Sequence, residues 1–95
     1  MSRNDADAEA ANLAALAKAI GHPARVLILR FLSSRNECVA QEVVDQLPLA
    51  QSTVSEHLRI LRDAGLINAR PQGSSTLYCV NQSGLGDLKQ SVAAL

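Results

Sequence analysis

Aromatic residues are almost missing from this sequence of 95 residues, which has one phenylalanine, Phe31, one tyrosine, Tyr78, and no tryptophan. Aliphatic side chains must therefore fill any hydrophobic core. Apolar residues make up 47% of the chain, which is typical of a globular domain rather than of a disordered segment. A chain of this length forms one small domain, which association with a second copy would stabilise.

Net charge is also missing, because nine basic residues balance nine acidic ones. This balance argues against binding of polyanions through bulk charge, but it leaves room for a local basic face. The sequence has no long apolar run and no signal peptide, so we expect a soluble, cytoplasmic protein with no membrane partner. Cysteine occurs only as Cys38 and Cys79. Without export features, two cysteines are more typical of reduced thiols than of a structural disulfide.

Apolar spacing and turn residues predict a chain of short helices and strands. Residues 1–8 are polar and lack a stop signal, so we expect a flexible tail before a single domain over residues 9–95. The expected elements are helices over 9–20 and 23–32, a short strand at 38–40, helices over 41–47 and 51–64, strands over 66–71 and 76–81, and a helix over 84–95. This order, α-α-β-α-α-β-β-α, is that of a winged helix-turn-helix, a mainly α fold with a small β-wing.

Short polar side chains crowd the start of the expected helix 51–64. They are Gln51, Ser52, Thr53 and Ser55. In a helix-turn-helix the second helix lies in the major groove of DNA, with its N-terminal residues at the base edges. Hydroxyls can reach bases or phosphates, and glutamine can read adenine. Helix capping is the alternative, but one cap accounts for only one hydroxyl. The pattern therefore predicts contact with double-stranded DNA.

The stretch "LAQSTVSEHLRILRDAGLI", residues 49–67, resembles the DNA-binding signature of the ArsR-type (ArsR/SmtB) family of bacterial metal- and redox-sensing repressors. "HPARVLILRFL" is similar to the second helix of that family and "GSSTLYCV" to its wing, so the likeness runs from about Leu13 to Leu88. Ala50 stands where the family often has serine, so we expect the helix to lack a strong N-cap or to use Ser52 in its place. The resemblance implies a homodimeric transcriptional repressor that binds a palindromic operator through residues 51–64 and the wing, residues 68–80. The DNA contacts it implies are Gln51, Ser52, Thr53, Ser55, His57, Arg59 and Arg70.

The resemblance also implies that the first and last helices form the dimer interface. Both helices carry more apolar side chains than one short core needs, which agrees with a two-fold contact. The residues expected in it are Leu13, Leu16, Ile20, Leu85, Leu88 and Val92.

The two cysteines are the candidate sensing residues. If Val39 and Tyr78 point into the core, the alternation of side chains along strands places Cys38 and Cys79 together on the outer face. Two neighbouring thiols could bind a thiophilic metal or metalloid such as arsenite, or oxidise to a disulfide. The family often has Cys-x-Cys at this position, and Ala40 replaces the second cysteine, which puts a three-thiolate site in doubt. The alternative is that both cysteines are small apolar residues with no ligand.

Several other readings find less support in the residues. His22 is expected to begin the second helix, His57 could pack or donate to a phosphate, and Arg62 could be a simple surface charge. The last helix offers only Asp87 to a zinc site. No nucleophile elbow or phosphate-binding glycine loop indicates an enzyme. A winged helix that binds other proteins is the second functional class, but it would not need the polar start of helix 51–64.

Overall fold

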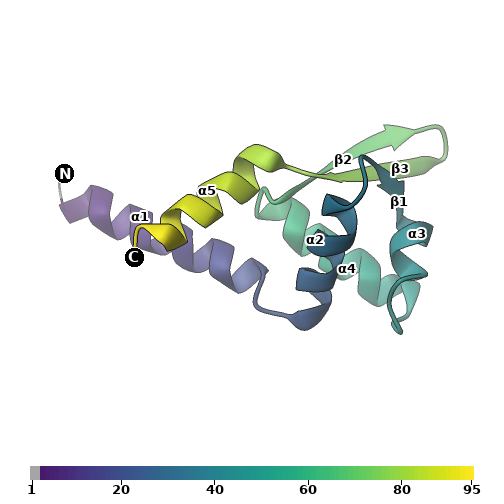
Figure 1. Ribbon diagram of the computed structural model, residues 1–95, viewed down its shortest axis with the longest axis horizontal. Coiled ribbons are helices and arrows are strands. Elements are labelled where there is room, and N and C mark those ends of the chain that lie inside the picture. The colour runs from purple at the N-terminus through teal and green to yellow at the C-terminus, as the bar shows by residue number, and fades with distance from the viewer. Residues whose placement is uncertain (1–2) are drawn as a thin grey trace.

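A computed structural model describes residues 3–95 and confirms a mainly α fold with a small antiparallel sheet (Figure 1). Its elements are α1 (Arg3–Ala19), α2 (Pro23–Ser33), β1 (Cys38–Val39), α3 (Ala40–Val44), α4 (Gln51–Asp63), β2 (Ile67–Gln72), β3 (Ser75–Val80) and α5 (Gln82–Ala93). The order matches the winged helix-turn-helix expected from the sequence, and each predicted helix and strand is present.

Helix α1 begins six residues before the expected helix, so residues 3–8 of the expected tail are helical. Alanine is the strongest helix former, and an acidic residue in the first turn is favoured by the helix dipole. Ala6 and Ala8 supply the first property and Asp5 the second. The expected tail also included Met1 and Ser2, which lie outside the described residues.

The core forms where the apolar stripes of α2 and α4 meet. Val54, Leu58 and Leu61 are fully buried along one side of α4, as their helical spacing predicts. Ile28 and Leu32 of α2 are equally buried and belong to the same cluster. Because this stripe is buried, the opposite side of α4 faces outward.

The sheet has the strand order β1-β3-β2, and both pairings are antiparallel. Strands β2 and β3 form the wing, and their turn contains Gly73 with a φ of 60°, a conformation that glycine adopts without strain. Strand β1 pairs only two residues with β3, Cys38 opposite Tyr78 and Val39 opposite Leu77. This register decides which face each cysteine occupies.

The molecule is elongated, with extents of 46 × 25 × 21 Å. Helices α1 and α5 lie side by side at one end and the wing lies at the other, with α4 between them (Figure 1). Leu16 of α1 and Leu88 of α5, two of the residues expected in the dimer interface, are buried in the core of a single chain. The packing of α1 against α5 uses these inner side chains. Of the expected interface residues, Val92 remains exposed.

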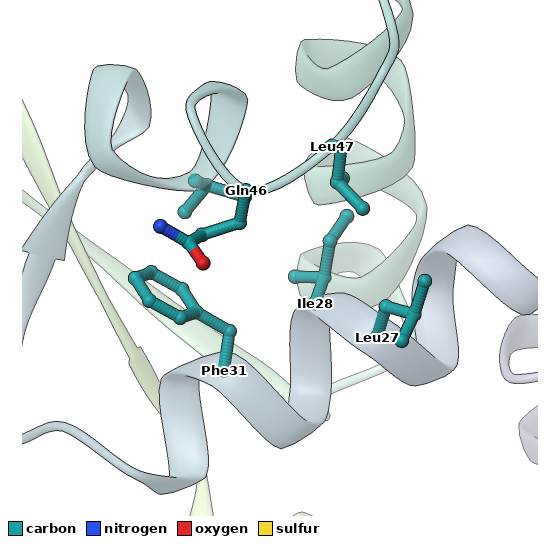
Figure 2. A pocket seen from close by; sticks show the side chains of 6 residues that line it. Leu27, Ile28, Phe31, Gln46 and Leu47 are labelled. Atoms are coloured by element: carbon teal, nitrogen blue, oxygen red, sulfur yellow. The ribbon is translucent and has the colours of Figure 1, made fainter.

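Helices α2 and α3 leave a small apolar hollow of about 190 Å³ between them. Figure 2 shows Gln46 over the ring of Phe31 on one side of it, with Leu27 and Leu47 on the other. The guanidinium of Arg35 lies 4.9 Å from the centre of the half-buried Phe31 ring, which is a cation–π contact.

None of the helices formed by residues 3–95 combines the length and the apolar character that crossing a membrane requires.

Candidate nucleic-acid interface

The first turn of α4 has no side-chain cap. Ala50 occupies the N-cap position in an extended conformation and its methyl group cannot accept a hydrogen bond, as the sequence predicts. The exposed side chains that follow form no hydrogen bond or ion pair within residues 3–95. These side chains are Gln51, Ser52, Thr53 and Ser55. Their hydroxyl and amide groups are therefore available to an external partner, and local capping does not account for them.

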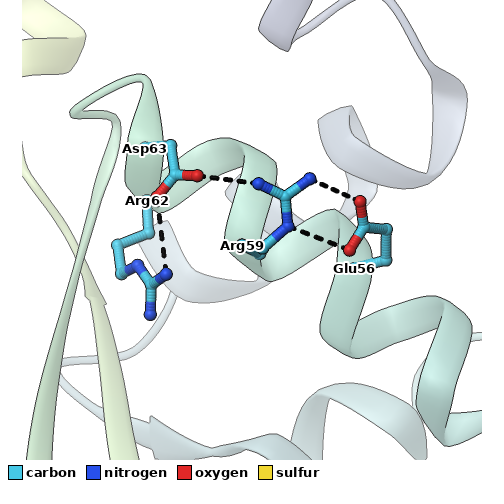
Figure 3. A network of polar contacts seen from close by, with 4 residues as sticks. All are labelled: Glu56, Arg59, Arg62 and Asp63. Carbon is cyan, nitrogen blue, oxygen red and sulfur yellow. Dashed lines mark hydrogen bonds and ion pairs between the residues drawn. The ribbon is translucent and has the colours of Figure 1, made fainter.

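The second half of α4 is different, because its charges neutralise one another (Figure 3). Nε of Arg59 donates to Oε2 of Glu56 over 3.0 Å, and its Nη2 donates to Oε1 of the same carboxylate. Nη1 of Arg59 donates to Oδ2 of Asp63 over 2.8 Å, and Arg62 lies 3.4 Å from Oδ1 of Asp63. The hydrogen bond from Arg59 holds the pKa of the Glu56 carboxyl below its usual value. Arg59 is thus exposed, as a phosphate contact requires, but it already has two carboxylate partners.

His57 is turned toward α2 and not outward. Its ring is half-buried, and its centroid lies 4.5 Å from that of His22. His22 has the role predicted for it, because its Nδ1 accepts a hydrogen bond from the amide of Ala24 and caps α2. Burial, followed by the nearby His22 and Arg25, lowers the pKa of His57. This geometry favours the packing role of His57 over the DNA contact that the family resemblance implies.

The wing presents Arg70 at its surface. Nη2 of Arg70 donates to Oε2 of Glu37 over 2.5 Å, which ties β2 to the residue before β1. The hydrogen bond raises the pKa of Arg70, so its charge is permanent. Arg70 and Glu37 are both largely exposed, and exposed ion pairs stabilise a fold by only about 0–1 kcal/mol. Arg70 can therefore exchange Glu37 for a phosphate at little cost.

The predicted arrangement of the cysteines is wrong. Cys38 is buried in the core, whereas the expected inward residue, Val39, is only partly buried. Cys38 pairs directly with Tyr78, which packs against the core as predicted. Directly opposed residues share a face and successive residues alternate, so Cys79 lies on the other face of the sheet from Cys38. The two thiols do not meet on one outer face.

The surroundings of Cys38 suit a thiol better than a thiolate. Burial, and then the charge of Glu42, raise the pKa of Cys38. Both cysteines are unbonded, with Cys79 partly exposed on the wing. Across residues 3–95, His, Cys, Asp and Glu side chains nowhere gather in the groups of three that could hold a metal ion.

Sequence reasoning missed the carboxylate partners of the arginines. The spacings of Glu56 and Asp63 from Arg59, three and four residues, are a signal that could have found the network on α4. No sequence signal indicates the contact of Glu37 with Arg70, because 33 residues separate them.

Comparison with known families agrees with the family resemblance seen in the sequence. Residues 22–69, which span α2 to the start of β2, match the model of the bacterial regulatory protein family arsR. The HTH-type transcriptional regulator YgaV of Escherichia coli is 37% identical over 78 residues, which cover 82% of this chain and 79% of YgaV. The HTH-type transcriptional repressor SmtB of Mycobacterium tuberculosis is 38% identical over 63 residues, 66% of this chain. The match spans only 46% of SmtB.

Solved structures share the fold. The crystal structure of a possible transcriptional regulator for arsenical resistance superposes with a TM-score of 0.78 at 26% identity. The superposition covers 83% of this chain and 81% of that protein. The structural match therefore covers more of the chain than the segment that the family model matches.

Proposed function

Because this chain belongs to the arsR family of bacterial regulatory proteins, whose members are DNA-binding transcriptional regulators and not enzymes, we propose that it is a homodimeric repressor of a palindromic operator. In this proposal each copy inserts α4 into the major groove and places its wing on the DNA backbone, in the cytoplasm. The observation that carries the proposal is the row of exposed, unpartnered polar side chains at the uncapped start of α4.

The chemistry of this row agrees with reading of base edges. The N-terminal residues of a recognition helix are those that contact bases, and Gln51 can form two hydrogen bonds with adenine. Ser52 and Ser55, three residues apart, lie on the same side of the helix. The neutralised second half of α4 adds little charge, so we expect phosphate affinity to be moderate and most of the specificity to come from the first turn and a half.

The test is an electrophoretic shift assay on operator duplexes selected by the protein from a random library. Gln51→Ala and Ser55→Ala should each weaken specific binding by about 1–3 kcal/mol. Arg70→Ala should weaken binding to all duplexes and reduce its salt dependence. Parent-like operator binding by both α4 variants would mean that α4 does not read the DNA.

The proposed dimer uses the end of the molecule formed by α1 and α5. Val92 of α5 and Leu95, which follows that helix, are exposed there, and an open groove is lined by Leu13 and Leu95. Exposed apolar groups on a chain this small favour association with a second copy. Four of the expected interface residues are not fully buried within one chain: Leu13, Ile20, Leu85 and Val92. Sedimentation at micromolar concentration should give a dimer, and Val92→Asp should give a monomer.

The inducing signal is a separate question. Because Cys38 is buried, we infer that Cys38 and Cys79 of one chain do not act together as the sensor. Names of similar proteins refer to arsenical and mercury resistance, which keeps a thiophilic metal or metalloid as a candidate ligand. Cys79 is the thiol that such a ligand would reach first. Operator release by trivalent arsenic or an oxidant should not require both thiols. If the parent were released from the operator and both Cys38→Ser and Cys79→Ser lost this release equally, the two thiols would have to act together.

The second functional class, a winged helix that binds other proteins, finds less support. Such a module would present an apolar patch on α4, whereas the outer side of α4 is polar along its length.

A further inference from the structure

An open hollow of about 350 Å³ lies where α1, α2 and α4 meet. Alanines and Ile60 form its apolar wall. Its polar wall brings together Lys18 of α1, Arg25 of α2, and Arg59 and Asp63 of α4. Three cationic side chains and one carboxylate thus converge from three helices in a chain whose net charge is zero.

The positive charge of this hollow is not neutralised from within. The charge of Asp63 is matched by Arg59 and Arg62, and Glu56 takes the remaining hydrogen bonds of Arg59. Lys18 and Arg25 form no ion pair within the described residues. Two positive charges therefore face the hollow without a carboxylate partner, which makes it attractive to an anion.

Arg25 has a second unusual feature, because its Nε is buried and has no hydrogen-bond partner within residues 3–95. A buried donor without a partner costs about 1–3 kcal/mol, so such donors in native proteins have a partner in water or a ligand. Arg25 also lies in the first turn of α2, where the helix dipole favours a negative group. Arg25 thus lines an open hollow with its charge and also holds a buried donor that has no partner within residues 3–95.

We propose that this hollow binds a phosphate group, held by Arg25 and supported by Lys18. The planar fork of arginine matches a phosphate with two parallel hydrogen bonds, and the ammonium of lysine adds a point charge. Arg59 belongs both to the hollow and to the outer side of α4. A group bound in the hollow therefore lies beside the recognition helix.

The phosphate has two possible sources. One is the DNA backbone that borders the groove occupied by α4, where helix-turn-helix proteins place most of their positioning contacts. This source rests on the proposed function. The wing would then meet the backbone at one place, and the hollow, lined by residues of α1, α2 and α4, would meet it at another. The second source is a free phosphate that binds in the absence of DNA.

The DNA source is tested by the salt dependence of operator affinity in the full-length protein. Arg25→Gln and Lys18→Gln should each reduce the slope of log affinity against log salt by about one per subunit. Arg30→Gln is the matched control, because Arg30 is exposed on the same helix and lies outside the hollow. Arg25→Lys should keep most of the slope. Lys18 is exposed, so its variant folds even if a change at half-buried Arg25 does not.

Binding of a free phosphate ion is tested by titrating the parent and Arg25→Gln with inorganic phosphate at constant ionic strength. The amide chemical shifts of residues around the hollow are followed by NMR. Shifts in the parent alone identify free phosphate as the ligand. Unchanged slopes together with no phosphate-dependent shifts would overturn the proposal, as would equal loss of slope in Arg30→Gln. Failure of the parent to select any operator would reject the proposed function, while the phosphate titration would still test the hollow.

Discussion

The two halves of α4 share one helix and one buried stripe, but they treat their polar groups in opposite ways. In the first half, Gln51 and the three hydroxyl residues have no partner within residues 3–95 and no cap. In the second half, Arg59 and Arg62 are tied to Glu56 and Asp63. Unpaired neutral groups can read a partner by hydrogen bonding, whereas a closed ionic network must first open. Hydrogen-bonding groups without a partner among the described residues and paired charges are therefore separated along a single helix.

The largest effect on stability should come from changing the buried stripe that both halves of α4 share. Leu58→Ala removes a fully buried side chain between them and should lower the free energy of unfolding by about 2–5 kcal/mol. Thr53→Ala, at an exposed position of the same helix, should change it by less than about 0.5 kcal/mol. Urea unfolding followed by circular dichroism measures both. A small loss for Leu58→Ala would show that α4 is not held by the core.

The next effect is on operator binding and concerns the first half of α4. Ser55→Ala combined with Gln51→Ala should weaken operator binding by several kcal/mol if each contributes about 1–3 kcal/mol. Stability should stay near that of the parent, because neither side chain has a partner among residues 3–95. Ser83→Ala, an exposed serine of α5, is the control. A double variant that unfolds more easily would assign a structural role to these residues.

A smaller effect of opposite sign is expected in the second half. Glu56→Gln removes a charge that neutralises Arg59, so affinity for any duplex should rise a few-fold and its salt dependence should steepen. Fluorescence anisotropy at several salt concentrations measures both quantities. Reduced affinity for one operator sequence alone would instead make Glu56 a reader of bases.

The smallest effect concerns His57, on the buried side of the same helix. Its pKa is lowered in the folded chain, so below the unfolded value of about 6.5 the unfolded chain binds more protons. Stability should therefore be full above this pH and fall as the pH drops through the folded pKa. Melting temperatures of the parent and His57→Asn between pH 7.5 and 5 should diverge at the acidic end. Parallel curves would contradict the burial of His57 against His22.

The sequence predicted α4 well because its apolar residues recur at a spacing that places them all on one face of a helix. It also predicted the missing cap at Ala50. The cysteines were misplaced because β1 has only two residues, and two residues contain no alternation to read. Their faces are decided by pairing of Cys38 with Tyr78, 40 positions along the chain. The ion pair of Arg70 with Glu37 and the convergence of Lys18 with Arg25 likewise depend on tertiary contacts that local patterns do not encode.

The bare first turn of α4 also has a consequence for hydration. With Ala50 at the cap, the first backbone N–H groups of the helix have no side-chain acceptor, and in the free protein water molecules must take that place. Docking on DNA would release these waters along with those on Ser52 and Ser55. Operator affinity should therefore respond to osmotic pressure, and an osmolyte excluded from the interface should strengthen binding even where ionic strength is held constant.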